Sequence, residues 1–118
     1  MSHYKKLLIW QKSISLVTII YRSTKKFPKE EIFGITSQIR RSSVSIPSNI
    51  AEGSGRESNK DFVRFLYISL GSLFEMQTQL EIAKNIEYLT EEEFNNLYED
   101  SREIERMLVS LIKKLKDS

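Results

Sequence analysis

Apolar side chains recur along the chain at intervals of three and four residues, the spacing of one face of an α-helix. The pattern predicts four helices, over about residues 5–26, 31–52, 58–86 and 91–116. We find no strict alternation of apolar and polar positions, as a half-buried strand would show. Because the predicted connections are short, neighbouring helices should run antiparallel. The sequence therefore predicts an all-α, up-down-up-down four-helix bundle in which residues 1–118 form a single domain.

The first two helices differ in the regularity of their apolar stripes. The core stripe expected in the first helix is Leu7, Trp10, Ile14, Val17 and Tyr21, and Leu16 and Ile20 widen it. Serines interrupt the stripe of the second helix, and Pro47 lies inside it. Proline lacks a backbone N–H and clashes with the preceding turn, so we expect a kink near Pro47. Gly53 and Gly55 follow, and a glycine in the left-handed conformation is expected to end this helix.

The third and fourth helices carry the most regular stripes. These stripes are Phe62, Leu66, Ser69, Leu73, Met76, Leu80 and Ala83, then Phe94, Leu97, Ser101, Ile104, Leu108, Leu111 and Leu115. A second apolar set lies on other faces of the third helix, which indicates either a central position in the bundle or contact with another subunit; its members are Val63, Phe65, Ile68, Leu70 and Phe74. Thr90 and Glu93 predict a capping box at the start of the fourth helix.

Charge is distributed unevenly along the chain. Residues 1–60 carry 11 Lys and Arg against 4 Glu, and residues 61–118 carry 7 against 12 Asp and Glu, which together give the net charge of +2. Such asymmetry favours a basic surface that faces nucleic acid. It is equally expected of two solvated helical faces that attract each other within the bundle.

Composition excludes several classes of chemistry. The chain has no Cys, so disulfides and thiolate metal sites are excluded, as is typical of a cytoplasmic protein. Its apolar runs are shorter than the ~20 residues of a membrane span, and no signal peptide is recognisable. The lone histidine, His3, cannot supply the paired Glu-x-x-His ligands of a di-iron bundle. We therefore expect no enzyme activity, no metal and no cofactor.

Two sets of polar residues are candidates for function. The nucleic-acid-binding candidates are Lys25, Lys26, Lys29, Arg40, Arg41, Arg56 and Lys60. The second set is a structural polar network expected to join Arg40 or Arg41, Asn49, Glu52 and Glu75, because a carboxylate in the apolar third helix requires a partner. In an antiparallel bundle the lysines near residue 26 and those near residue 58 fall at opposite ends, so a single chain does not obviously unite them.

Several segments resemble a known family. They are FPKEEIFG (residues 27–34), QIRRSS (38–43), SIPSNIAEG (45–53) and FLYISLGS (65–72), with Arg56, Glu75 and the pattern of residues 8–12. Together they resemble the four-helix bundle proteins encoded in intervening sequences of bacterial large-subunit ribosomal RNA genes. Some members are similar to the accessory variability determinant protein of diversity-generating retroelements. The resemblance implies a bacterial homopentamer that binds RNA or DNA, with a reverse transcriptase as a possible kind of partner.

Two functions remain open from the sequence. The first is a homo-oligomeric accessory protein that binds RNA or DNA through Lys and Arg contacts to phosphate. The second is a protein–protein scaffold with no nucleic-acid role. They differ in whether the basic side chains converge on one exposed face.

Overall fold

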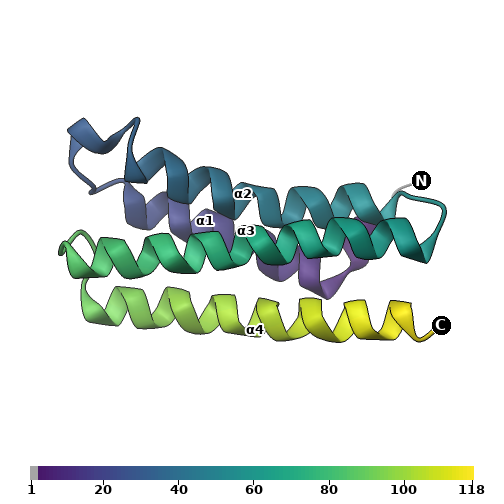
Figure 1. Ribbon diagram of the computed structural model, residues 1–118. Helices are drawn as coiled ribbons and strands as arrows, with labels where there is room; N and C mark the ends of the chain where they lie inside the picture. The colour runs from purple at the N-terminus through teal and green to yellow at the C-terminus, as the bar shows by residue number, and fades with distance from the viewer. Residues whose placement is uncertain (1–2) are drawn as a thin grey trace.

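The computed structural model describes residues 3–118 and is all-helical across that range. Its four long helices are α1 (Leu8–Thr24), α2 (Ile35–Ser54), α3 (Asn59–Asn85) and α4 (Glu91–Lys116). Two short 3-10 turns, η1 (Tyr4–Lys6) and η2 (Lys29–Glu31), precede α1 and α2. The helices run antiparallel in an elongated bundle of 45 × 23 × 20 Å, which confirms the predicted four-helix architecture (Figure 1).

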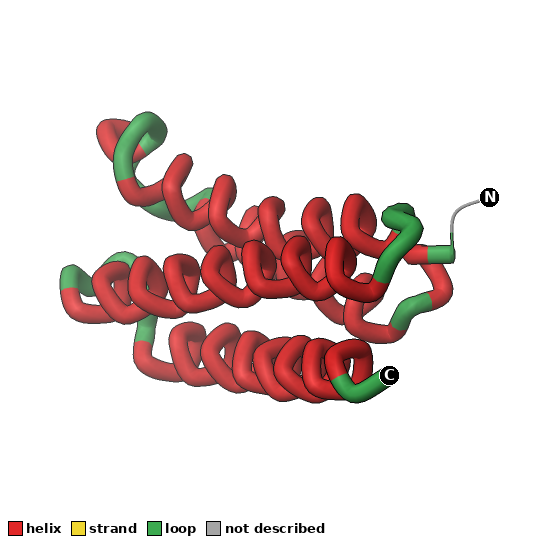
Figure 2. Tube along the Cα trace, turned by 45° about the vertical axis from the view of Figure 1, so that its right-hand side comes forward, coloured by secondary structure: helices red, strands yellow, loops and turns green. Residues whose placement is uncertain are grey.

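The order of the helices gives the bundle two distinct ends. The start of α1, the end of α4 and the turn between α2 and α3 lie together at one end, on the right of Figure 1. The α1–α2 and α3–α4 connections lie together at the other end, and the view in Figure 2 shows the same grouping of loops. Residues far apart in sequence therefore share an end of the molecule.

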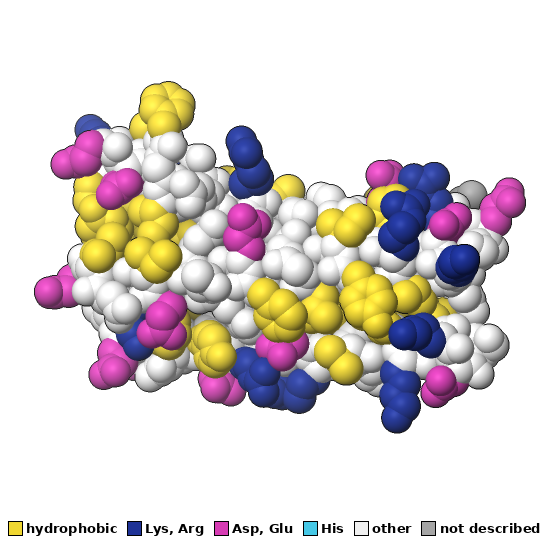
Figure 3. All heavy atoms as spheres, viewed as in Figure 1, with side chains coloured by type: hydrophobic (Ala, Val, Ile, Leu, Met, Phe, Trp, Pro, Cys, Tyr) yellow, Lys and Arg dark blue, Asp and Glu magenta, His cyan; other side chains and the backbone are white. Residues whose placement is uncertain are grey.

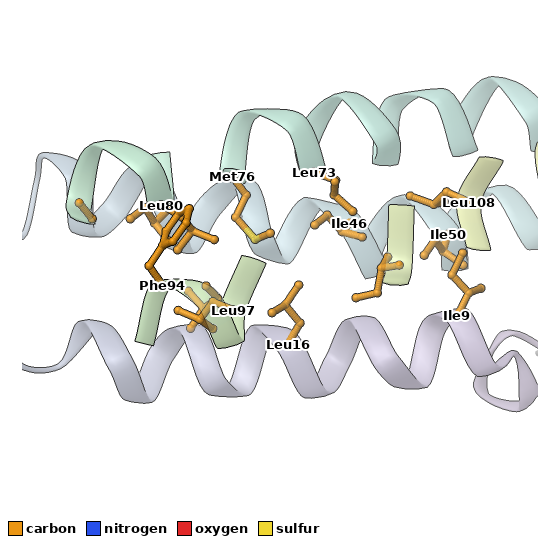
Figure 4. Packing of buried hydrophobic residues seen from close by; sticks show 14 of the residues in the cluster. Ile9, Leu16, Ile46, Ile50, Leu73, Met76, Leu80, Phe94, Leu97 and Leu108 are labelled. Carbon is orange, nitrogen blue, oxygen red and sulfur yellow. The ribbon is translucent and has the colours of Figure 1, made fainter. Parts of the chain in front are cut away.

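The core is a layer of aliphatic side chains that all four helices contribute. Leu73, Met76 and Leu80 of α3 and Leu108 of α4 are fully buried, as their regular stripes predict. In Figure 4, Ile9 and Leu16 of α1 point into the same interior as Ile46 and Ile50 of α2. This layer holds the helices together and leaves their outer faces for other contacts.

The stripe predicted for α1 is only partly correct, since Leu16 and Ile20 are buried and Leu7 and Trp10 pack against the core, whereas two other members do not. Ile14 and Tyr21 are 39% and 40% exposed, and the residues that face the core are Ile9, Ser13, Leu16, Ile20 and Thr24. Burial of the two polar residues is possible because their hydroxyls bond to the helix itself. Ser13 donates to the Ile9 carbonyl at 2.7 Å, and Thr24 donates to the Ile20 carbonyl at 2.8 Å.

Two helices begin later than predicted. The start of α1 is Leu8 rather than residue 5, because Leu7 is extended (φ −74°, ψ 122°) and separates the helix from η1. Similarly, α2 begins at Ile35 rather than residue 31, because η2 and Gly34 (φ −108°, ψ −124°) occupy the intervening chain. Pro47 is buried within α2, and the helix continues through it to Ser54.

Small residues line the seam between α2 and α3. Gly53 is buried there, and a Cβ on this residue would lie 2.6 Å from the Cβ of Phe65. The expected left-handed glycine at the end of α2 is absent, because Gly55 has φ −86° and Gly53 remains helical. Glycine is required here for the close approach of two helices and not for a turn.

Candidate nucleic-acid interface

Basic side chains gather at the end of the bundle where α1 begins and α4 ends. They come from η1, from the α2–α3 turn and the start of α3, and from the last turn of α4. We call this surface the basic end, and its residues are Lys5, Lys6, Arg56, Lys60, Arg64, Lys113, Lys114 and Lys116. All of these side chains are exposed, and they outnumber the acidic residues of the same end, which are Glu52, Glu57, Asp61 and Asp117. Figure 3 shows Lys and Arg side chains concentrated on the corresponding side of the surface.

Aromatic rings and hydrogen bonds hold several of these cations in place. The guanidinium groups of Arg56 and Arg64 lie 4.9 Å and 4.6 Å from the ring centre of Phe65, so one aromatic side chain positions both. The ammonium of Lys116 lies 3.4 Å from the hydroxyl of Tyr67. Asn59 donates to the Ser118 hydroxyl at 2.9 Å, which joins the start of α3 to the end of the chain. The basic end is therefore an ordered surface built from separate segments.

The opposite end, which we call the acidic end, carries three of the predicted binding residues. Lys25, Lys26 and Lys29 are exposed there among the glutamates Glu30, Glu31, Glu87, Glu91, Glu92 and Glu93. Lys26 forms an ion pair with Glu93. Nearby carboxylates repel phosphate, so these lysines are poorly placed to hold a nucleic-acid backbone.

At the acidic end, charged and polar side chains join the connecting segments to one another. The ammonium of Lys26 and the backbone N–H of Thr90 hold the pKa of Glu93 below its ordinary value. The hydroxyl of Tyr88 donates to the carboxylate of Glu31 at 2.9 Å, which raises the pKa of Tyr88. These contacts link the α1–α2 connection to the α3–α4 connection and α4.

Arg40, another predicted binding residue, is turned toward α1. Its Nε donates to the Thr24 hydroxyl at 2.9 Å, its Nη2 reaches the Tyr21 carbonyl at 3.4 Å, and its guanidinium lies 4.7 Å from the Tyr21 ring centre. A cation at the last carbonyls of a helix stabilises that terminus. The geometry gives Arg40 the role of anchoring the end of α1 to α2.

The predicted network of Arg41, Asn49, Glu52 and Glu75 is not formed in the structure. Glu75 is exposed on α3 and makes no hydrogen bond or ion pair within residues 3–118, although it lines a shallow depression with Arg41. Asn49 donates to the Ser45 carbonyl at 2.8 Å, and Glu52 lies 4.0 Å from Arg56. The prediction failed because it took Glu75 to be buried in an apolar helix, whereas this side chain is exposed.

Other polar pairs join α2 to α3 instead. Ser42 donates to the side-chain carbonyl of Gln79 at 2.7 Å, and the hydroxyls of Ser45 and Ser72 lie 2.8 Å apart. Ser69 donates to the Ile46 carbonyl at 2.9 Å. These bonds satisfy buried hydroxyls and set the register of the two helices.

The seven predicted binding residues thus separate into three groups. Arg56 and Lys60 belong to the basic end, the three lysines near residue 26 belong to the acidic end, and Arg40 and Arg41 lie between the ends. Sequence reasoning missed Arg64 and the lysines of η1 and the end of α4. The lysines at the end of α4 could have been included from the sequence, because an up-down-up-down bundle places the end of its fourth helix beside the turn between its second and third helices.

The described residues contain neither a metal-binding cluster nor a membrane-spanning helix. Between residues 3 and 118, no cluster of three or more His, Cys, Asp or Glu side chains is arranged to hold a metal ion. None of the helices in this range has the length and apolar character needed to cross a membrane.

Comparisons with known proteins place the chain in a family. A model of the family described as 23S rRNA-intervening sequence protein matches residues 5–110. A crystal structure described as a protein with unknown function from the S23 ribosomal protein family of Bacteroides thetaiotaomicron VPI-5482 is similar, with a TM-score of 0.81 and 32% sequence identity. The similarity covers 90% of this chain and 99% of that one. No match was found among curated proteins. This chain therefore belongs to the 23S rRNA-intervening sequence protein family.

Proposed function

We propose that this protein is a non-enzymatic, homo-oligomeric accessory protein that binds RNA through the phosphate contacts of its basic end. The observation that carries the proposal is the unequal distribution of charge along the bundle, since Lys and Arg outnumber acidic residues at the basic end and glutamates outnumber lysines at the acidic end. The family's description, which refers to a ribosomal RNA intervening sequence, favours RNA over DNA as the first ligand to test.

The chemistry of the basic end favours contact with the nucleic-acid backbone. Lys and Arg bind phosphate and release counterions, so the affinity should fall steeply as salt rises. Arg56 and Arg64 are already stacked on Phe65, which lowers the entropy lost when they bind. Contacts of this kind position RNA without selecting a base sequence.

A pair of matched variants tests the proposal. Lys60→Glu with Lys113→Glu reverses two charges at the basic end, and Lys25→Glu with Lys29→Glu reverses two at the acidic end. All four lysines are exposed and form no ion pair within residues 3–118. Binding of a structured RNA would be measured by fluorescence anisotropy between 50 and 200 mM salt, concentrations across which such binding changes by orders of magnitude.

We expect the basic-end variant to bind at least about tenfold more weakly at low salt, with a salt slope smaller by about 2. The acidic-end variant should bind as the unmodified protein does. Equal losses in the two variants would show that net charge, and not the basic end, determines binding. Binding that is unchanged by salt would contradict the phosphate mechanism.

The homo-oligomeric part of the proposal is supported by the outer face of α3. Ile68, Phe74 and Ile82 are each between 43% and 46% exposed on this helix, and Ile86, which directly follows it, is 46% exposed. A Cβ added at Gly71 would meet no atom within 4 Å, so the folded chain does not itself require glycine there. Glycine in a helix interior costs up to about 1 kcal/mol relative to alanine, and a close crossing by a helix of a second copy would explain it.

Solution mass tests this part separately. Phe74→Glu should reduce the mass measured by light scattering to that of one chain, because it places a charge in the proposed contact. Ile19→Glu, on α1 and 38% exposed, is the matched control and should leave the assembly intact. Unmodified protein that is already a single chain at micromolar concentration would contradict the oligomer, including the homopentamer that the resemblance implies.

The scaffold alternative is favoured by one feature of the acidic end. Phe33 is 92% exposed beside Ile32 in the α1–α2 connection, and an exposed aromatic side chain is a common anchor in protein contacts. This function would require a protein partner, of which a reverse transcriptase is the kind implied by the resemblance to the accessory variability determinant protein. A Phe33→Asp variant that binds RNA normally but loses a purified partner would support it.

A further inference from the structure

A groove with an apolar floor lies between the start of α1 and the last three turns of α4. Its volume is about 510 Å³, within the range of small-molecule sites. Leu7, Leu8, Ile9, Met107 and Leu111 supply the apolar part of its lining. The stripe of α4 that lines it runs from Glu103 to Lys114, about 16 Å at 1.5 Å per residue. The groove therefore extends along about three turns of α4.

The groove leaves apolar surface exposed at the start of α1. Leu8 is the first residue of α1, and its side chain is 55% exposed. Met107 and Leu111 are partly buried and pack against the core from the opposite side of the groove. A ligand lying between them would bury apolar surface that the chain leaves in water, which is favourable.

The charges at the rim of the groove are predominantly positive. Arg106 and Lys114 line it, and neither makes a hydrogen bond or ion pair within residues 3–118. Glu103 also lines it, but the Lys12 ammonium lies 3.1 Å from its carboxylate and compensates its charge. Two cations without partners beside an apolar floor are complementary to an anion that carries an apolar body.

We propose that this groove is a binding site for a small amphipathic anion, a monocarboxylate with an extended hydrocarbon chain. The chain lies along Leu8, Met107 and Leu111, and the carboxylate is held at one end of the groove by Arg106 or at the other end by Lys114, since these two residues are eight positions, about 12 Å, apart along α4. The inference does not depend on RNA binding, because it requires only this groove and its two cations.

Calorimetric titration with three probes of equal chain length tests the site. Dodecanoate carries the proposed charge, dodecan-1-ol is neutral, and dodecyltrimethylammonium has the opposite charge. We expect dodecanoate to bind one per chain, about tenfold more tightly than the alcohol, as is typical of a hydrogen bond to a charged group. The cationic probe should bind more weakly than the alcohol.

Two variants locate the binding. Arg106→Gln with Lys114→Gln should remove the preference for the anion and leave the alcohol unaffected, whereas Leu8→Ser should weaken both. Lys25→Gln with Lys29→Gln, at the acidic end, is the matched control and should change neither. The proposal is overturned if dodecanoate shows no saturable binding, if the alcohol binds as tightly, or if the groove variants behave as the control does.

Discussion

A single glycine sets how closely α2 approaches α3. Gly53 is buried against Phe62 and Phe65, and the space that its missing side chain leaves is occupied by the aromatic residues of α3. Gly55, two residues later, is exposed and open to solvent, so it serves no such contact. The two glycines look equivalent in the sequence and have different roles in the structure.

Gly53→Ala should therefore destabilise the bundle. The new Cβ would lie 2.6 Å from the Cβ of Phe65, so the helices must separate. We expect a loss of about 1–3 kcal/mol in the free energy of unfolding, the usual cost of overpacking. Urea denaturation would measure it, with Gly55→Ala as the control that should change stability by less than about 1 kcal/mol. A stable Gly53→Ala protein would show that the seam is not tightly packed.

Arg40 and Arg41 offer a second comparison at the same scale. Arg40 bonds to Thr24 and the Tyr21 carbonyl, whereas Arg41 is exposed. Arg40→Gln should lower the free energy of unfolding by about 1–2 kcal/mol and leave RNA affinity nearly unchanged. Arg41→Gln should cost less than about 0.5 kcal/mol. If Arg40→Gln lost much of its RNA affinity without losing stability, Arg40 would be an RNA-binding residue and not a structural one.

At the scale of the elements, α4 has opposite charge at its two ends. Glu91, Glu92 and Glu93 open the helix, and Lys113, Lys114 and Lys116 close it, an order that complements the helix dipole. The predicted capping box is confirmed, since Thr90 accepts from the Glu93 N–H at 3.1 Å and Glu93 accepts from the Thr90 N–H at 2.8 Å. The same arrangement supplies one end of the bundle with glutamates and the other with lysines.

The lowered pKa of Glu93 predicts how stability depends on pH. Because the folded state favours the ionised carboxylate, the stabilisation is present above the unfolded-state pKa of about 4.3 and is lost as pH falls through the lower folded-state pKa. Glu93→Gln should remove this contribution and flatten the stability profile in acid. Thermal unfolding at pH 7, 4 and 3 would measure it. An unchanged acid profile in the variant would contradict the contacts with Lys26 and Thr90.

Buried leucines of α3 and α4 support the packing of the elements. Leu73 and Leu108 are fully buried in the layer shown in Figure 4. Truncation of either to alanine should cost roughly 2–5 kcal/mol, measured by urea denaturation. Val109→Ala is a control on the neighbouring exposed position, where the loss should be below about 1 kcal/mol. A loss below 1 kcal/mol at Leu108 would mean that this part of the core is loosely packed.

At the scale of the whole molecule, the fold converts charge that is uneven along the chain into charge that is uneven in space. The basic first half and acidic second half do not form separate faces. Each helical hairpin instead brings distant residues to a common end, as Lys60 and Lys116 line one depression beside Asn59 and Ser118. The basic end therefore combines residues from three separate segments of the sequence.

The helical spacing of apolar residues correctly predicted the buried face of a helix wherever the apolar residues are also the buried ones. This holds for α3 and α4, whose predicted stripes are largely buried. It fails in α1, because Ile14 and Tyr21 are apolar but exposed, while Ser13 and Thr24 are polar but buried through bonds to their own helix. Hydrophobicity alone cannot identify a hydroxyl that the backbone satisfies.

The candidate site was only partly predictable for a different reason. The sequence identified Arg56 and Lys60 but not the lysines that close α4, which also complement the helix dipole. Their second role depends on which ends of the helices meet, which is a property of the topology. Arg40 was assigned to the surface because its bonds to α1 join residues 16 and 19 positions away in the chain.

The most direct test of the central claim is a lysine footprint of the protein with and without a structured RNA. Acetylation of each lysine would be quantified by mass spectrometry at low salt. The account predicts that RNA protects Lys60, Lys113 and Lys116 and leaves Lys25 and Lys29 as reactive as in the free protein. Protection of Lys25 and Lys29, with Lys60 and Lys113 unaffected, would contradict it and move the interface to the acidic end.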